Sequence, residues 1–116
     1  MSFTAVPQSD NSQKPSPRAQ LLVQVECRES EAYSLGRSQN VSQSGILVST
    51  PETFEPETEV AIRFWLPAPQ PIPIEANGVV VRFHPGKEMG IKFLQLSDQD
   101  RQAISTYVDR TRIGLQ

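Results

Sequence analysis

The sequence has few of the residues on which metal sites and enzyme centres usually depend. It contains one cysteine, Cys27, and one histidine, His84, in 116 residues. A single cysteine excludes an internal disulfide framework and a cysteine-rich zinc site. A single histidine cannot build a histidine-based metal site and leaves little for acid–base catalysis. We therefore expect no catalytic residue, no metal and no cofactor. Cys27 is expected to be a small buried apolar group, and His84, next to a proline, a turn residue.

Long apolar runs and an excess of one charge are also missing. No stretch reaches the ~20 apolar residues of a membrane span, and residues 1–10 have neither the basic nor the apolar region of a signal peptide. Lys and Arg total 11 against 13 Asp and Glu, a net charge of −2. Such a balance gives no broad attraction to a nucleic acid polymer. These absences predict a soluble cytoplasmic protein without membrane insertion.

The chain divides into a polar leader and one domain. Residues 1–19 are rich in Ser, Gln, Pro and Asn, which predicts a flexible N-terminal tail. The tail carries two cations near its end, Lys14 and Arg18, and the prolines between them make this segment stiffer than a Gly/Ser linker. Residues 20–114 suffice for one domain with one modest core.

Apolar alternation in residues 20–114 predicts six strands followed by a helix. The helix begins with a capping box over 97–100, turns Ile104, Tyr107 and Val108 inward, and ends near Gly114. This order predicts a mainly β fold, a six-stranded antiparallel β-barrel with a C-terminal α-helix packed on it. The expected strands are 21–27, 33–39, 45–50, 60–66, 74–83 and 88–96, with a bulge or close backbone approach at Gly78.

The segment 40–45 between the second and third expected strands is a polar turn followed by an apolar run. Asn40 and Ser42 either close this turn through bonds to the neighbouring backbone or face a ligand at the mouth of the strand pair. Gly45 either serves the backbone conformation or lets the chain lie close against another group. The six residues alone leave these alternatives open.

The order of these pieces resembles the PilZ domain family over residues 14–110. The turn Asn40-x-Ser42-x-x-Gly45 is similar to the family's Asp/Asn-x-Ser-x-x-Gly element. The tail segment Lys14-x-x-x-Arg18 resembles its Arg-x-x-x-Arg element, with lysine in place of the first arginine. Residues 88–97 are similar to the family's last strand and helix entry.

The resemblance implies a receptor for cyclic di-GMP, a bacterial second messenger with two guanines and two phosphates. Arg18 would bond a guanine edge or clamp a phosphate with its planar fork. Lys14 would neutralise a phosphate without the bidentate contact, which predicts weaker binding than in a two-arginine relative. Arg82 would pack on a guanine face, although a solvent-facing strand residue is the alternative.

The turn residues would complete that site. Asn40 would accept a hydrogen bond from a guanine edge, Ser42 would donate to a phosphate, and Gly45 would let the backbone approach the ligand. Binding would order the tail over the barrel and so signal to a downstream protein partner, with the chain a monomer or weak dimer. Motility or biofilm formation would be the regulated process.

An alternative is a PilZ-fold adaptor that no longer binds the nucleotide and serves pilus, flagellar or chemosensory machinery. The missing first arginine and the proline-rich loop 67–73 favour this interpretation. Trp65 is expected in the core or at an interface rather than as a platform for stacked bases.

Overall fold

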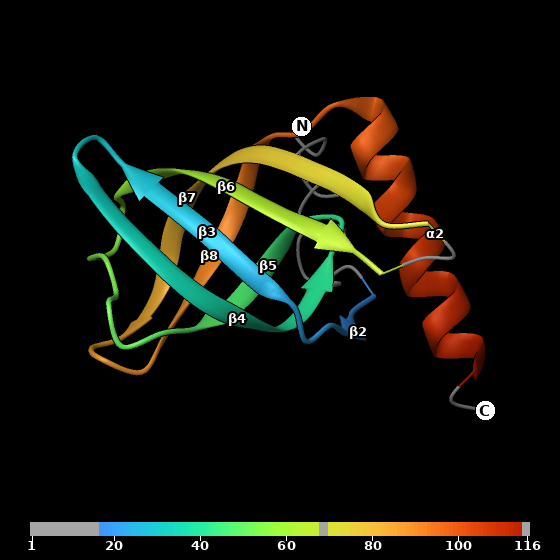
Figure 1. Cartoon of the computed structure of the whole chain (residues 1–116), viewed down its shortest axis with the longest axis horizontal. Coiled ribbons are helices and arrows are strands. Elements are labelled where there is room, and N and C mark those ends of the chain that lie inside the picture. The colour runs from blue at the N-terminus through green and yellow to red at the C-terminus, as the bar shows by residue number, and fades with distance from the viewer. Residues whose placement is uncertain (1–16, 68–69, 115–116) are drawn as a thin grey trace, which may run out of the picture.

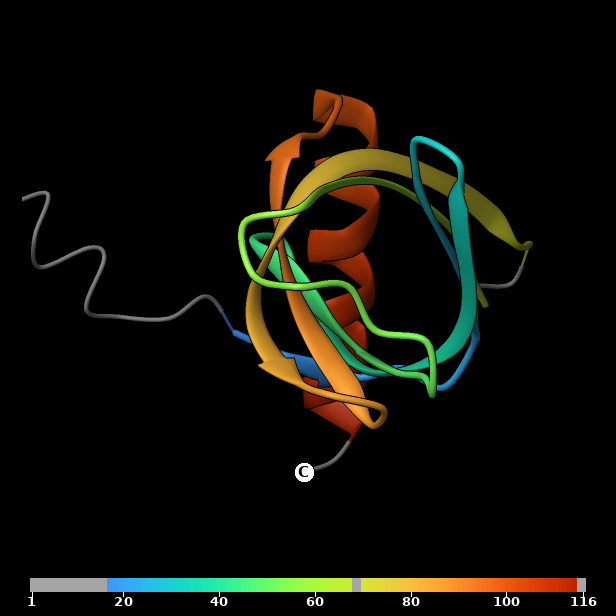
Figure 2. The same cartoon turned by 90° about the vertical axis from the view of Figure 1, so that its left-hand side faces the viewer.

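The structure is a computed structural model that describes residues 17–67 and 70–114. Antiparallel strands curl into a barrel, and one helix crosses an end of it (Figure 1). Viewed from the opposite end, the helix lies behind the strands (Figure 2). The elements are β2 (Ala19–Gln20), β3 (Gln24–Glu29), β4 (Ala32–Ser42), β5 (Gly45–Ser49), β6 (Glu59–Leu66), β7 (Ile72–His84), β8 (Glu88–Gln95) and α2 (Asp98–Gly114).

The strands close into a ring. Their order is β4-β3-β6-β7-β8-β5, and β5 pairs back with β4, so the ring of these six strands has no free side edge. Every pairing is antiparallel. The prediction of a six-stranded antiparallel barrel with a C-terminal helix is therefore confirmed. The sequence pattern did not indicate β2, a short additional strand that pairs with β4 beyond the end of the β3 ladder.

The first strand of the barrel begins later than predicted. The prediction of a strand that starts at Leu21 is wrong, because β3 begins at Gln24. The Ser38 hydroxyl explains the interruption: it donates to the carbonyl of Leu21 and accepts from the amide of Val23 at 2.9 Å. A side chain therefore satisfies backbone groups that a strand ladder would otherwise pair.

The interior follows the predicted alternation. Inward-facing residues of every long strand are buried, and burying each large apolar side chain contributes about 1.5–3 kcal/mol. Ile104 and Val108 of α2 are buried against one end of this core, and Tyr107 packs beside them. The Ser97 hydroxyl accepts from the Asp100 amide at 3.0 Å, which confirms the predicted helix cap.

Two further predictions concern single residues. The β7–β8 register shifts between Asn77 and Gly78, and a Cβ at Gly78 would lie 2.7 Å from both the Ile91 side chain and the Lys92 carbonyl. Gly78 thus combines a bulge with a close approach, as predicted. Cys27 is fully buried, and this burial raises the pKa of its thiol to about 12. It is the expected apolar core residue.

Candidate functional site

Arg18 meets the end of β4. This strand was predicted to end at 39 but continues through Asn40 to Ser42, so the turn itself comprises only residues 43 and 44. The β2–β4 ladder aligns Gln20 with Asn40, which places the preceding residues above that turn. Nε of Arg18 donates to Oδ1 of Asn40 at 2.6 Å, and Nη1 lies 3.4 Å from Oγ of Ser42. Three of the residues predicted for the site are therefore in contact. Lys14, the other cation of the tail motif, lies outside the described residues.

Ser42 also closes the turn. Its side chain is fully buried, and its Oγ accepts from the Ser44 amide at 3.1 Å and bonds the Ser44 hydroxyl at 2.9 Å. The turn-closing role weighed from the sequence is present, and the same oxygen faces Arg18. Ser42 is thus held in one position by the bonds that form the turn.

Gly45 follows the second alternative weighed from the sequence, a close approach of the chain to another group. Gly45 is aligned with Lys92 of β8, and a Cβ at Gly45 would lie 2.4 Å from the carbonyl oxygen of Ile91. Its φ is not in the left-handed region. Glycine is required here because β5 and β8 approach too closely for any side chain. A contact between Gly45 and a ligand remains a prediction.

A row of outward-facing residues connects the turn to Arg82. The pairings align Asn40 with Leu47, Leu47 with Gly90, and Gly90 with Arg82, across β4, β5, β8 and β7. Three strand spacings separate the ends of this row, or about 14 Å along the sheet. Leu47 and Gly90 are only half-buried. A Cβ at Gly90 would lie 3.1 Å from the Cβ of Arg82, so glycine at this position makes room for the stem of that arginine.

The two arginines share an electrostatic environment. Partial burial lowers the pKa of the Arg18 guanidinium, and the positive charge of Arg82 lowers it further. Among the side chains described in residues 17–67 and 70–111, the close contacts between basic and acidic groups are Arg63 with Glu75 and His84 with Glu88. Arg18 and Arg82 thus repel each other without a carboxylate between them. Such a pair of cations attracts an anion.

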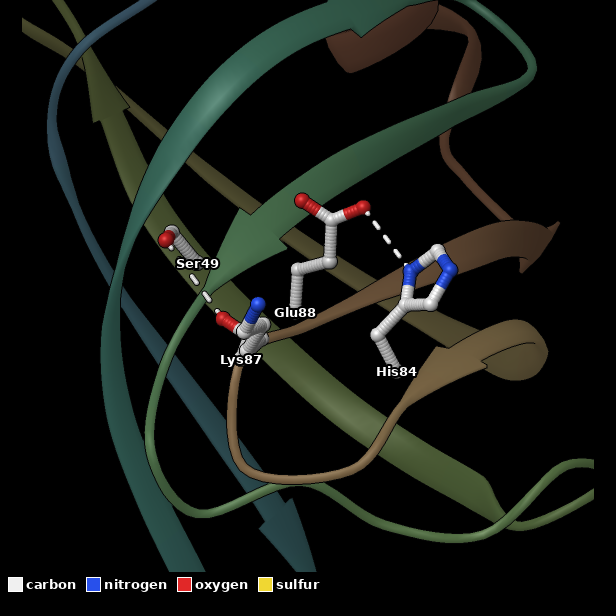
Figure 3. Close-up of polar contacts among 4 residues, drawn as sticks. All are labelled: Ser49, His84, Lys87 and Glu88. Carbon is white, nitrogen blue, oxygen red and sulfur yellow. Dashed lines mark hydrogen bonds and ion pairs between the residues drawn. The ribbon is translucent and has the colours of Figure 1, made fainter.

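The carboxylate of Glu88, on β8 close to this row of residues, is bonded to another side chain. Glu88, two positions before Gly90 on β8, accepts a hydrogen bond at Oε2 from Nδ1 of the His84 ring at 3.1 Å (Figure 3). Ser49 beside them donates to the carbonyl of Lys87 at 3.5 Å. His84 ends β7 and enters the β7–β8 turn, in keeping with the predicted turn role.

Sequence reasoning missed three residues of this face: Leu47, Gly90 and Lys92. Lys92 is exposed and aligned with Gly45, so it adds a third cation beside the turn. For Gly90 and Lys92 the available signal was the alternation in 88–96, where the apolar residues Met89, Ile91 and Phe93 lie at every second position. The residues between them had to point outward. Their common row with Asn40 and Arg82 depends on the strand order.

A groove lies on another part of the barrel. This concavity of about 790 Å³ is lined by residues of β3, β6, β7 and β8 and by Arg101 of α2, and it contains the Arg63–Glu75 ion pair, 3.7 Å. None of the residues predicted for the site lines it. In the part of the chain that the structure covers, no three acidic, histidine or cysteine side chains gather as a metal site would require.

Fold and site together define a small β-barrel module whose outer face carries two arginines beside an amide and a hydroxyl. A family model described as PilZ domain matches residues 13–110. The chain therefore belongs to the PilZ domain family, a family of cyclic di-GMP receptors. PilZ domains are generally binding or adaptor modules without enzymatic activity. No curated protein matches the chain.

Two solved structures share the fold. The Bacillus subtilis inhibitor of motility, MotI/DgrA, superposes with a TM-score of 0.78 at 23% identity, covering 87% of this chain. The present chain spans about half of that protein, 52%. The PilZ domain of CeSA from a cellulose-synthesizing bacterium gives a TM-score of 0.55 at 22% identity, covering 84% of this chain and 96% of that domain. Among the described helices, none has the length and apolar character needed to cross a bilayer.

Proposed function

We propose that this chain binds cyclic di-GMP on the outer face of β4, β5, β8 and β7. The observation that carries the proposal is the contact of Arg18 with Asn40 and Ser42, with Arg82 at the far end of the same cross-strand row. Membership of the PilZ family supports the choice of ligand. The proposed function is binding alone and includes no catalytic step.

The chemistry of the face suits a dinucleotide with two planar bases and two phosphates. The Arg18 fork can bond O6 and N7 of a guanine together or clamp a phosphate, and Arg82 can stack on a base. Leu47 offers an apolar surface for a flat ring between Asn40 and Gly90, with the stem of Arg82 lying over Gly90 beside it. Lys92 adds a positive charge for a phosphate on the same face.

Asn40 has a particular consequence for the charge of the site. Its neutral amide oxygen accepts from Arg18 without neutralising the guanidinium. An aspartate at this position would form an ion pair with Arg18 and would bond a guanine edge more strongly. With asparagine, more of the Arg18 charge is available to a phosphate. Compared with a site that has aspartate at this position, we therefore expect contacts with phosphate to contribute more of the binding free energy. We also expect the affinity to depend more strongly on ionic strength.

The proposed output is a change in the N-terminal tail. Ligand bound beside Arg18 would order the preceding residues, including Lys14, over the barrel and so create or cover a surface for a protein partner. The likeness in fold to a protein named as an inhibitor of motility supports motility as the regulated process. A cytoplasmic location, typical of PilZ proteins, and a monomer or weak dimer complete the proposal.

Titration calorimetry of the full chain with cyclic di-GMP tests this function. We expect a dissociation constant below ~100 μM, which corresponds to ~5.5 kcal/mol of binding free energy. Cyclic di-AMP is the matched control because it keeps both phosphates and lacks the guanine O6. Absence of heat with cyclic di-GMP at ~100 μM would refute the proposal. Equal affinity for both nucleotides would leave a phosphate site without guanine recognition.

A second candidate function is an adaptor that binds its partner without nucleotide. The observation that favours it is a set of exposed large apolar residues on the outer side of β4 and β6, Tyr33, Leu35 and Trp65, which are 44–48% exposed. Aromatic and leucine side chains of this kind are typical of interface centres. A partner captured equally with and without cyclic di-GMP would favour the adaptor, and capture that requires the nucleotide would count against it.

A further inference from the structure

The placement of Arg18 depends on a very short strand. β2 consists of Ala19 and Gln20, which are aligned with Val41 and Asn40 of β4. A ladder of two residues has few hydrogen bonds and is marginal by itself. Arg18 directly precedes this strand. Contacts that hold β2 therefore determine how firmly the guanidinium is presented to the turn.

Residues after β2 are firmly attached to the barrel. The Leu21 side chain is buried, and its amide donates to the carbonyl of Gln39 at 3.1 Å. The Ser38 hydroxyl then binds the backbone of the next residues. These bonds anchor the chain on the side of β2 that leads into β3, away from Arg18.

Tyr107 supplies the contact from α2. Its hydroxyl donates to the backbone carbonyl of Gln20 at 2.7 Å, across 87 positions of sequence. The neighbouring helix residues Ile104 and Val108 are buried in the core, so α2 is fixed relative to the barrel. Tyrosine has only two side-chain torsions, and its ring is itself half-buried. The hydroxyl is thus a rigidly held donor to β2.

We propose that Tyr107 is a positioning residue for the ligand site and that α2 responds to occupation of that site. The inference rests on the proposed function and extends it to the helix. Gln20 is bonded to Tyr107 on one side and is aligned with Asn40 on the other, and Asn40 is the residue that receives Arg18. Fixing Gln20 limits the directions in which Arg18 can leave β2. A preorganised arginine loses less conformational entropy on binding.

The coupling must act in both directions. If the Tyr107 bond favours ligand binding, then bound ligand favours the Tyr107 bond by the same factor. Ligand on the outer face of β4 would therefore hold β2 more firmly against α2. The helix, which covers one end of the barrel (Figures 1 and 2), becomes the element through which the state of the site is transmitted.

The test compares the full chain with Tyr107→Phe, which removes one hydroxyl and keeps the ring. Tyr33→Phe is the matched control, because Tyr33 lies on the exposed outer side of β4. Two quantities are measured: hydrogen exchange of the Leu21 amide without ligand, and affinity for cyclic di-GMP. For Tyr107→Phe we expect about fivefold faster exchange and about fivefold weaker binding, the factor that one ordinary hydrogen bond supplies. Tyr33→Phe should change neither.

The two measurements separate the failure of this inference from the failure of the proposed function. If the wild-type chain binds no cyclic di-GMP, the proposed function fails, and exchange at Leu21 still decides whether Tyr107 holds β2. Unchanged exchange in Tyr107→Phe overturns the inference. The inference is also overturned if Tyr107→Phe exchanges its Leu21 amide faster but binds cyclic di-GMP with unchanged affinity. A thermal midpoint of Tyr107→Phe within a few degrees of that of Tyr33→Phe excludes a general loss of fold. Should Tyr107→Phe not fold, Tyr107→Trp, which retains a hydrogen-bond donor, is compared with Tyr107→Leu. Equal exchange of the Leu21 amide in these two variants overturns the inference.

Discussion

Nε of Arg18 donates to Oδ1 of Asn40 across 2.6 Å, although 22 positions separate the two residues. The contact joins the end of the N-terminal segment to the turn of a hairpin in the barrel. It also places Arg18 beside a neutral amide, which does not cancel the positive charge of the guanidinium. The affinity for an anionic ligand should consequently depend on Arg18 more than on any other cation of this face.

Replacing Arg18 should remove ligand binding. Arg18→Ala eliminates the contacts with Asn40 and Ser42 and one of two uncompensated charges, so we expect at least a hundredfold loss of affinity for cyclic di-GMP, on the order of 3 kcal/mol. Titration calorimetry measures it. Arg63→Ala is the control, because Arg63 pairs with Glu75 on another wall of the barrel. An equal loss in both variants would contradict a specific role for Arg18.

Restoring the first arginine of the tail motif should strengthen binding. Lys14→Arg replaces a point charge by a fork that can contact guanine or phosphate in a bidentate manner, so we expect about tenfold to a hundredfold tighter binding. The measurement is the same titration, with Lys87→Arg in the β7–β8 turn as the control for a guanidinium added outside the tail. Unchanged affinity in Lys14→Arg would place the tail away from the ligand.

Gly45 should prove structurally indispensable. A Cβ at this position would lie 2.4 Å from the Ile91 carbonyl oxygen, and backbone on both sides leaves little room to relax. We expect Gly45→Ala to cost about 2 kcal/mol or more of unfolding free energy in urea titrations. Gly86→Asn is the control, because Gly86 has open space and a φ of 72° that asparagine tolerates. A loss below about 0.5 kcal/mol in Gly45→Ala would contradict the close approach of β5 and β8.

The buried thiol of Cys27 should make stability depend on alkaline pH. Its pKa rises from an ordinary 9.0 to about 12 in the folded chain. The unfolded chain therefore releases this proton first, and stability falls as pH rises from about 9 toward about 12, by roughly 1.4 kcal/mol per pH unit. Between about pH 8 and about pH 10.5 we expect a loss of roughly 2 kcal/mol in urea titrations relative to Cys27→Val. Parallel pH profiles for the two chains would contradict it.

The helix and the barrel could be predicted from local patterns. The alternation in 60–66 and 88–96 continues through whole strands, and the Ser97 cap precedes a clear helical spacing. These signals depend on neighbours along the chain, so the sequence suffices to read them. The start of the first strand could not be read in this way. Leu21 and Val23 have strand-like side chains, but the hydroxyl of Ser38 binds their backbone from another strand.

The contact of Arg18 with Asn40 and Ser42 joins residues that motif spacings had singled out, whereas no feature in the sequence marks Leu47 and Gly90. These two belong to the same face only because β4, β5, β8 and β7 are neighbours in the ring. A close approach at Gly45 was one alternative from the sequence, but the atom that it approaches belongs to Ile91 of β8 and could not be named from local patterns.

The sequence by itself determined the class of fold, the polar turn and the presence of cations near both ends of the proposed ligand face, because periodicity and short spacings are local properties of the chain. Only the tertiary structure decided that Arg18 reaches Asn40, that Arg82 stands at the far end of the same row, and that Tyr107 holds Gln20. These relations depend on strand register and barrel closure, which bring together residues separated by 22 to 87 positions.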